Sequence, residues 1–315
     1  MPIVVPLALP IVESNPLMSI RKLLLLLPLV VAFQSPSRAI DIYVNNQLGN
    51  DQLPGTSAEP RQGDGPVETI SRGLRIAGRS DRLIIANTGI PYNEMISLSG
   101  PHHSGSVERP FTIVGNGAVI DGTILAAPEA WSHVADSTFA MPPRRLTYQH
   151  LFLDGKPLPR SDASQALDLQ PLQWALADGK IYFATQDNRV PESYDLRHCG
   201  LQTGITLYNT RHVQIENLVI QGFQQDGINA HELASRCDLI DVECRANGRS
   251  GLSVGGVSHV RVIRGNFYDN GRVQVRTEGL AKLELYQCDV AEGSSPPYSA
   301  EGKSLLVDGQ LITTP

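Results

Sequence analysis

Three consecutive stretches near the C-terminus begin alike and have nearly equal lengths: GITLYNTRHVQIENLVIQGFQQD (204–226), GINAHELASRCDLIDVECRANGRS (227–250) and GLSVGGVSHVRVIRGNFYDNGRV (251–273). Each begins with Gly and an aliphatic residue, and the successive starts are 23 and 24 residues apart. Short alternating strands, separated by turns rich in Gly and Asn, fill each stretch. A fixed period of this length is typical of a solenoid in which every repeat forms one coil.

Apolar residues fall into columns when these stretches are placed in register. Parallel strands stack about 4.8 Å apart, so like side chains would lie above one another inside the coils. The columns are Ile205, Ile228, Leu252 and Val275; Val213, Cys237, Val260 and Leu283; Ile215, Leu239, Val262 and Leu285; Leu218, Val242, Gly265 and Cys288; and Ile220, Cys244, Phe267 and Val290. The sequence therefore predicts an all-β, single-stranded parallel β-helix. Asn247 and Asn270, each followed by Gly, are expected to turn its corners in the left-handed conformation.

Residues 40–124 fit the same plan with a looser register. Residues 66–77 are predicted to form a helix, because Pro66 stands in the first turn, apolar residues recur on one side and Gly78 follows. A short amphipathic helix at this point would cap the open end of the solenoid. Strands are expected around residues 83–86, 95–98 and 111–114.

Residues 125–200 interrupt the coils. His150–Leu158 and Trp174–Thr185 each hold alternating apolar residues around an Asp-Gly pair, which is a hairpin signal. We therefore expect a small β-rich insertion of hairpins. It contains both tryptophans, Trp131 and Trp174. Trp174 is a candidate for stacking on a sugar ring, and packing in the core of the insertion is the alternative.

The N-terminus has the features of an export signal. Two basic residues precede the apolar run Leu23–Phe33, and small residues suited to cleavage follow. The run is too short to span a bilayer. We expect residues 1–39 to be a signal peptide, with Met18 as a possible true start, and residues 40–315 to form a secreted or periplasmic β-helix domain. A buried strand is the alternative.

Composition narrows the range of partners. The net charge is −6, charged residues make up 18%, and no long run of Lys and Arg occurs. Binding to nucleic acid or to an anionic membrane through charge alone is therefore not expected.

Cys237, Cys244 and Cys288 fall in inward columns, and no Cys-x-x-Cys pair exists. We expect buried free thiols, no zinc site and a monomer.

The segments of the N-terminal half follow one another in a recognisable order. They are Tyr43-Val44, the Gly- and Asn-rich loop 49–55, the helix, Asp81–Ile85, Gly89–Glu94, Pro110–Ile113 and Ile120–Gly122. This order resembles the opening of secreted pectate-lyase-like β-helix proteins, and with the C-terminal coils the similarity covers most of residues 40–124 and 201–315. The resemblance implies a right-handed β-helix and a glycan partner, although this fold carries lyases, hydrolases, epimerases and inert modules.

Two outward rows of polar residues, one residue per coil, are candidates for binding an extended polymer. The first is Thr206, Asn229, Ser253 and Arg276, flanked by Asp226, His231, Glu232 and Glu278. The second is His212, Arg236, His259 and Lys282, beside Gln214, Asp238, Arg261 and Glu284. Arg236, His259 and Lys282 are expected to bind the carboxylates of an acidic polysaccharide. A solvated surface is the alternative.

The string Gln225–Asn229 is similar to the Asp-Asp-Gly-x-Asp stretch that binds calcium in one family of β-helix pectate lyases. The resemblance makes Asp226 and Asn229 candidate ligands of Ca²⁺. Gln225 and Asn229 replace two carboxylates of that pattern, although calcium prefers anionic oxygens, and the catalytic Lys of the family has no match. The alternative is a plain corner of the coil.

A lyase or epimerase acting on a polymer that contains uronic acids is the function we expect. Arg276 would neutralise the substrate carboxylate or take its C5 proton, His231 would carry a proton, and Glu232 would orient it. A hydrolase would instead use the carboxylates of Glu232, Asp226 and Glu278. The alternative from another class is a non-catalytic β-helix, possibly a shortened family member, that binds glycan or serves as a surface module.

Overall fold

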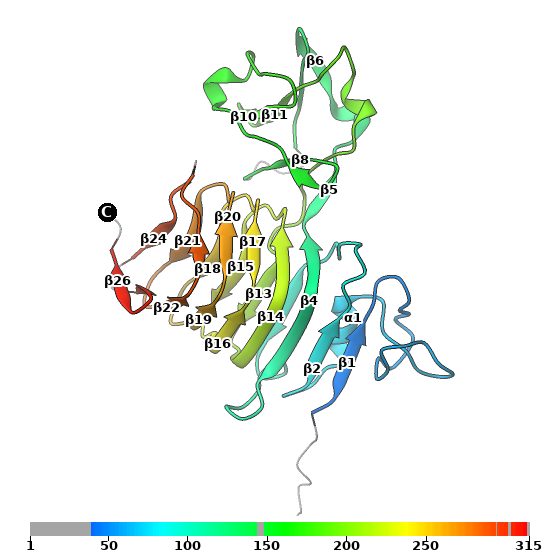
Figure 1. Cartoon of the computed structure of the whole chain (residues 1–315), viewed down its shortest axis with the longest axis vertical. Helices are drawn as coiled ribbons and strands as arrows, with labels where there is room; N and C mark the ends of the chain where they lie inside the picture. Colours follow the sequence, from blue (N-terminus) through cyan, green and yellow to red (C-terminus); the bar gives the residue numbers. More distant parts are fainter. Residues whose placement is uncertain (1–38, 144–147, 294, 302–303, 314–315) are drawn as a thin grey trace, which may run out of the picture. The chain divides into compact units, whose positions relative to one another are not determined.

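The computed structural model describes residues 39–143, 148–293, 295–301 and 304–313. The predicted signal peptide lies outside these residues except for Ala39. Two sheets of mainly parallel strands run along the coils (Figure 1). No helix in the described ranges is long and apolar enough to cross a membrane.

The larger of these sheets has twelve strands. Its pairing order is β1-β2-β4-β14-β16-β19-β22-β25-β26, and β17, β20 and β23 continue it from β14. The strands are β1 (Asp41–Val44), β2 (Arg82–Ile85), β4 (Phe111–Asp121), β14 (Arg211–Gln221), β16 (Ser235–Ile240), β17 (Glu243–Arg245), β19 (His259–Ile263), β20 (Asn266–Tyr268), β22 (Lys282–Tyr286), β23 (Asp289–Val290), β25 (Leu305–Val307) and β26 (Gln310–Ile312). Because β14 pairs with β16 and then with β17, this sheet forms two faces of each coil.

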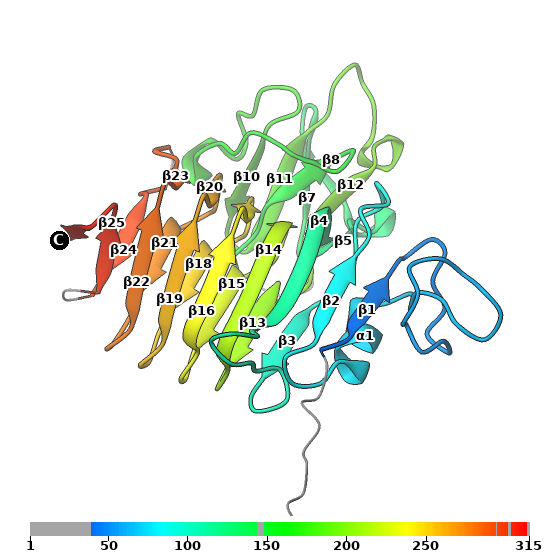
Figure 2. The same cartoon turned by 60° about the horizontal axis from the view of Figure 1, so that its bottom comes forward.

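The other sheet has six strands and forms the third face (Figure 2). Its order is β24-β21-β18-β15-β13-β3, and every pair is parallel. The strands are β3 (Ile96–Ser99), β13 (Ile205–Tyr208), β15 (Asp226–His231), β18 (Ser250–Val254), β21 (Val273–Thr277) and β24 (Tyr298–Ala300).

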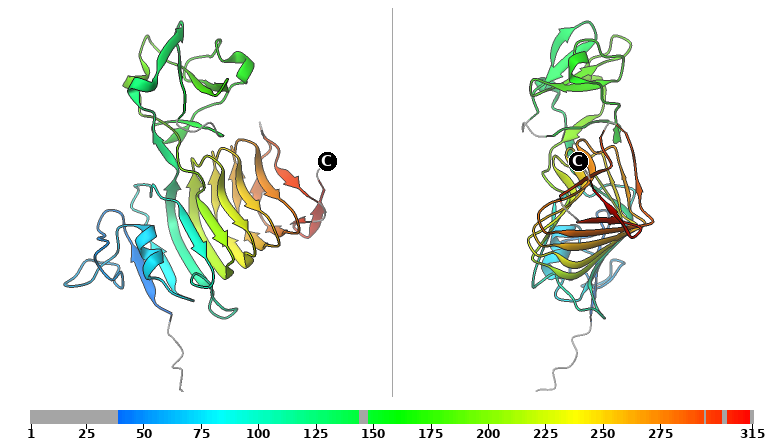
Figure 3. Two further views of the ribbon diagram at one scale, coloured as in Figure 1. Left: turned by 180° about the vertical axis from the view of Figure 1, so that it is seen from behind. Right: turned by 90° about the vertical axis from the view of Figure 1, so that its left-hand side faces the viewer.

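The predicted apolar columns form inside the coils. Val213, Cys237, Val260 and Leu283 pair in sequence along neighbouring strands, and each is at most 1% exposed. The Ile205 and Ile215 columns pair in the same way. In the right panel of Figure 3, which looks along the stacked coils, successive coils lie one behind another. The predicted right-handed parallel β-helix is confirmed.

The cysteines of the described ranges are free thiols, and only Cys288 is partly exposed. Burial raises the pKa of the Cys237 thiol to about 11 and that of Cys199 to about 12. These side chains therefore behave as small apolar residues rather than as reactive thiolates.

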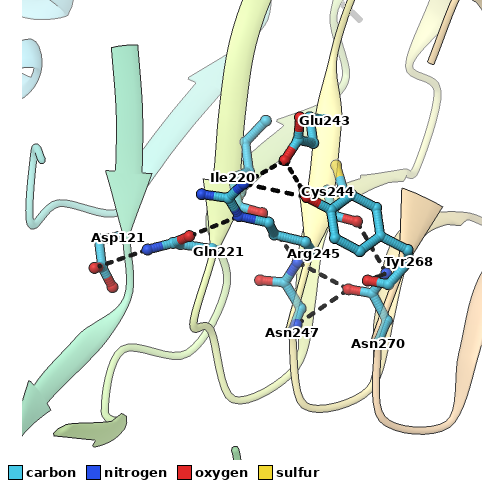
Figure 4. A network of polar contacts seen from close by, with 9 residues as sticks. All are labelled: Asp121, Ile220, Gln221, Glu243, Cys244, Arg245, Asn247, Tyr268 and Asn270. Carbon is cyan, nitrogen blue, oxygen red and sulfur yellow. Dashed lines mark hydrogen bonds and ion pairs between the residues drawn. The ribbon is translucent and has the colours of Figure 1, made fainter. Parts of the chain in front are cut away.

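The corner asparagines differ from the prediction. Ala246 and Asp269, with φ of 50° and 55°, take the left-handed conformation in place of Asn247 and Asn270. Both asparagines are buried instead, and Asn247 Nδ2 donates hydrogen bonds to the Ile220 carbonyl at 3.2 Å and to Asn270 Oδ1 at 3.0 Å (Figure 4). Their amides therefore connect adjacent coils from the inside.

The helix is shorter than predicted. α1 (Ile70–Ile76) begins at Ile70 rather than Pro66, because Val67 pairs with Val44 in a β-bridge and keeps the preceding segment extended. Thr69 caps the helix with its side-chain oxygen. The buried residues of α1 join the core of the coils.

The insertion between β4 and β13 consists of two small antiparallel sheets. Their strands are β5 (Thr123–Leu125), β6 (Ser132–Ala135), β7 (Thr138–Met141), β8 (Leu151–Leu153), β9 (Lys156–Pro157), β10 (Trp174–Ala177), β11 (Lys180–Ala184) and β12 (Leu196–Cys199), and short 3₁₀ turns lie at Pro128–Ala130, Ala163–Gln165 and Pro191–Ser193. Both expected hairpins form, with positive φ at Asp154-Gly155 and Asp178-Gly179, as a tight two-residue turn requires.

His150 connects the insertion to the coils. The Cys199 N–H donates to the His150 carbonyl at 3.3 Å, and the His150 ring packs beside Gly271 of the coils, where a built Cβ atom would lie 3.2 Å from Nε2. Burial, with a smaller contribution from Arg160, lowers the pKa of His150 to about 3. His150 is therefore neutral in the folded protein at neutral pH.

We expect stability to fall as the pH decreases from about 6.5 toward 3, because the unfolded chain then binds a proton that folded His150 does not. The slope from this residue would reach about 1.4 kcal/mol per pH unit. Urea unfolding of the wild type and of His150→Phe at several pH values would measure it. Equal slopes in the two proteins would contradict the prediction.

Candidate functional site

The first predicted row lies on the six-stranded sheet. Thr206 pairs with Asn229, Asn229 with Ser253, and Ser253 with Arg276, so one polar side chain follows another at each coil. Ser97 and Ser299 extend the row by one strand at either end. The sequence thus predicted this row in its observed register.

A cavity of about 230 Å³ lies where β15 and β18 end. Its lining residues are Asn229, His231, Glu232, Arg249, Ser253, Gly255, Gly256 and Glu278. Two of the predicted catalytic residues, His231 and Glu232, therefore share one cavity with Glu278. Arg276, the third, does not line it but forms an ion pair with Glu278 at its edge.

A Gly-Gly turn borders this cavity. A Cβ atom on Gly255 would lie 3.7 Å from the His231 Cβ and 3.8 Å from Glu278 Oε2. A Cβ atom on Gly256, whose φ is +65°, would lie 3.1 Å from the Glu232 backbone nitrogen and 3.9 Å from its carboxyl carbon. Both glutamates therefore lie beside the turn.

Asp226 is fully buried behind the row and holds no free oxygen. Its Oδ1 accepts from Arg249 Nε at 2.9 Å and from the Ser250 hydroxyl at 2.5 Å. Its Oδ2 accepts from Asn229 Nδ2 at 3.0 Å and forms an ion pair with the Arg249 guanidinium.

These contacts do not fit calcium at Asp226 and Asn229. The Arg249 guanidinium occupies the position in which a cation would bind, and the Asn229 amide turns its donor, not its oxygen, toward the carboxylate. No cluster of three or more acidic, His or Cys residues in the described ranges could hold a metal ion. Arg249, which lies about one repeat after Asp226, was not among the predicted site residues.

Arg276 is partly buried, with its side chain 20% exposed. Burial, followed by the charge of Arg249, lowers the pKa of the Arg276 guanidinium. The Arg276 guanidinium is already paired with the Glu278 carboxylate. Arg276 can therefore position Glu278.

The second predicted row lies on the twelve-stranded sheet and is broken. Ser235, rather than Arg236, pairs with His259, because Arg236 is an extra residue in β16 relative to β19. Arg236 and His212 both take the left-handed conformation, with φ of 55° and 53°. The prediction that Arg236 stacks with His259 and Lys282 in one continuous row is wrong for this reason.

A cavity of about 380 Å³ nevertheless brings part of this row together. It is lined by Ser106, Val107, Pro110, His212, Val213, Gln214, Arg236, Cys237, Asp238, His259, Arg261 and Glu284, whereas Lys282 lies outside it. The Arg261 guanidinium donates two hydrogen bonds to the Asp238 carboxylate, of 3.0 and 2.8 Å. Burial, then Arg236 and Arg211, lower the pKa of His212.

A third outward row, absent from the sequence analysis, crosses β4, β14, β17 and β20 (Figure 4). Gln221 Nε2 donates to Asp121 at 3.2 Å, and Arg245 Nε donates to Gln221 at 2.9 Å. Arg245 also bonds Tyr268 and Glu243. Because its members satisfy one another, this row is a structural network.

Trp174 does not form part of any site. It is 0% exposed, its Nε1 donates to the Leu158 carbonyl at 3.0 Å, and it packs in the core of the insertion. The His150 ring, at 6.0 Å, and the Arg160 guanidinium, at 5.2 Å, lie against the indole. The prediction that Trp174 binds sugar is wrong, because these neighbours leave no ring face for a ligand.

A protein-family profile described as right-handed beta helix region matches residues 203–308. Together with the strand pairing, this match shows that the chain has the right-handed parallel β-helix fold. A search of curated protein sequences finds no match.

Solved structures share this fold at low identity. One named "Glycoside hydrolase" superposes with a TM-score of 0.56 and 10% identity over 79% of this chain and 73% of the other. A complex of XylC with xylose has a TM-score of 0.44 and 12% identity over 86% and 67% of the two chains. The GH136 lacto-N-biosidase from Eubacterium ramulus has a TM-score of 0.43 and 14% identity over 85% and 50%. At these identities, the similarity shows a shared fold and says nothing of the reaction.

Proposed function

We propose that the protein is exported, binds an extended polysaccharide along the row from Thr206 to Arg276, and hydrolyses it at the cavity between Glu232 and Glu278. The observation that carries the proposal is the convergence of these two carboxylates and His231 on one cavity, which the middle members of the row, Asn229 and Ser253, also line. The solved structure of TM-score 0.56 is named a glycoside hydrolase, which makes hydrolysis the first reaction to test.

Two carboxyl groups suffice for this chemistry. One, protonated, gives its proton to the glycosidic oxygen as the C–O bond breaks, and the other activates water or attacks the anomeric carbon. Glu232 lies on the exposed turn after β15, and Glu278 is held by Arg276. Because Glu278 is paired with the Arg276 cation, we assign it the role of base or nucleophile and Glu232 that of acid.

Elimination or epimerisation of a uronate is the second candidate. The lowered pKa of Arg276 favours it, because a base must remove the C5 proton. The reaction also needs a cation for the substrate carboxylate, and Arg249 is already bound to Asp226. We rank it below hydrolysis for this reason.

Glu232→Gln and Glu278→Gln are each expected to reduce hydrolysis at least about 100-fold, because each removes one proton-transfer group. The chain of residues 40–315 would be incubated with pectate, alginate and xylan, and new reducing ends would be counted. Glu192→Gln, an exposed glutamate of the insertion outside the cavity, is the matched control and should keep full activity.

Other products would point elsewhere. An unsaturated product that disappears in Arg276→Ala would favour elimination, and proton exchange at C5 seen by NMR would favour epimerisation. Binding of a polysaccharide without any product would favour a non-catalytic module. Full hydrolysis by both glutamine variants would exclude this cavity as the active site.

A further inference from the structure

A separate cavity of about 240 Å³ lies at the corner between β20 and β21. It is lined by His150, Pro157, Leu158, Pro159, Arg160, Asp269 and Gly271. The candidate active site lies where β15 and β18 end, and it shares none of these residues.

His150 brings an unpaired ring nitrogen to this cavity. The residue is 7% exposed, and its Nε2 has no hydrogen-bond partner in the described part of the chain. A ring nitrogen of neutral histidine either donates or accepts a hydrogen bond, depending on the tautomer. Buried polar atoms without partners are rare, so this atom calls for a partner from a ligand or water.

Gly271 lies close to that nitrogen. A Cβ atom at this position would lie 2.3 Å from the Gly248 carbonyl oxygen and 3.2 Å from His150 Nε2. The close approach of the neighbouring coil therefore requires glycine here, and its lack of a side chain also leaves Nε2 uncovered on this side.

Arg160 supplies a cation that lacks a direct ion pair. Its guanidinium lies 5.2 Å from the centre of the Trp174 ring, and no carboxylate in the described ranges forms an ion pair with it. Burial, then the charge of Arg272, lower the pKa of Arg160, although the charge of Asp162 is near enough to raise it in part. A bound anion would relieve this repulsion and satisfy the planar donors of the guanidinium.

We propose that this cavity binds one anionic sugar unit, whose carboxylate pairs with Arg160 and whose hydroxyl forms a hydrogen bond with His150 Nε2. The volume is below the roughly 300–1,000 Å³ usual for larger ligands, which suits one ring rather than a chain. Pro157, Leu158 and Pro159 offer apolar walls for the C–H face of a pyranose. The site is independent of the proposed hydrolysis.

Isothermal titration of the full chain with glucuronate tests this site. Arg160→Gln is expected to weaken binding at least about tenfold, because it removes a charge-assisted pair. Arg189→Gln is the matched control: its guanidinium also lies over an aromatic ring of the insertion, Tyr194 at 4.2 Å, but away from the cavity. It should bind as the wild type does, and glucose should bind about tenfold more weakly than glucuronate.

Two results would overturn the proposal. The first is equal affinity of Arg160→Gln and the wild type for glucuronate. The second is inorganic sulfate binding as tightly as glucuronate, since the site would then recognise charge alone. Arg160→Gln should cleave polysaccharide at the wild-type rate, so that a failure here stays distinct from a failure of the proposed hydrolysis.

A measurement on the unaltered protein supports the test. The ¹⁵N resonance of His150 Nε2 should move on saturation with glucuronate, because a ring nitrogen shifts when it gains a hydrogen-bond partner. An unmoved resonance at saturation would exclude His150 from the site.

Discussion

Replacing Arg249 by Met is expected to lower the free energy of unfolding by about 3–5 kcal/mol, because it leaves a buried carboxylate without its cation. Asp226 is 0% exposed, and both of its oxygens bond Arg249. Met keeps most of the length and apolar volume of the side chain, so that the charge is the main change. Urea unfolding at neutral pH would measure the loss.

A second ion pair of the same geometry provides the control. The Arg264 guanidinium donates two hydrogen bonds of 2.6 Å to the Asp241 carboxylate. Unlike Asp226, both side chains of this pair are exposed, Arg264 by 51% and Asp241 by 46%. Solvent screens such a pair, so Arg264→Met should cost no more than about 1 kcal/mol. Similar costs for the two Met variants would mean that burial of Asp226 does not matter.

The double variant Asp226→Asn/Arg249→Met isolates the unpaired charge. Asn keeps the shape of Asp226 and can still accept from the Ser250 hydroxyl. The double variant is therefore expected to be more stable than Arg249→Met alone, although it contains one further substitution. Added calcium should rescue neither protein, because Asn229 turns its amide donor toward this position.

The coils could be predicted from one sequence because the buried positions recur once per coil, at the same interval as the sequence repeat. Each inward column, such as the one through Val213, Cys237 and Val260, must stay apolar at every step, and the pairing follows that pattern. The Asp-Gly hairpins were predictable for a different reason. Positive φ at both turn positions favours only a few residue types, and Asp178-Gly179 is such a pair.

The polar side chains were less predictable. Arg236 is offset by a single extra residue, which leaves the apolar columns unchanged and so gives no signal in their pattern. The short string Gln225–Asn229 contains only part of the surroundings of Asp226. Its main partner, Arg249, comes from the next coil and is not adjacent in sequence. Trp174 looked the same from sequence whether it lined a cleft or a small core, and only its burial decides between them.

The buried asparagine of the corner is expected to be almost as important to stability as the Asp226 ion pair. Asn247 Oδ1 accepts from the Phe223 N–H at 3.2 Å. Its Nδ2 donates to the Ile220 carbonyl at 3.2 Å, as Figure 4 shows. Asn247→Ala removes both bonds and leaves the Phe223 N–H of the preceding coil buried without a partner, whereas Ile220 stays paired in the ladder between β14 and β17. One unpaired backbone group costs about 1–3 kcal/mol and the net loss of the second bond about 1 kcal/mol, so we expect a total loss of about 2–4 kcal/mol.

Asn266→Ala is the matched control, because this asparagine of β20 is partly exposed and its amide bonds no other described residue. It should change stability by no more than about 0.5 kcal/mol. Native-state hydrogen exchange locates the effect: the Phe223 amide should exchange faster in Asn247→Ala and be unchanged in Asn266→Ala. Since Phe223 and Asn247 belong to adjacent coils, faster exchange there would mean that the asparagine couples one coil to the next. An unchanged Phe223 amide in Asn247→Ala would instead mean that the stacked strands alone provide this coupling.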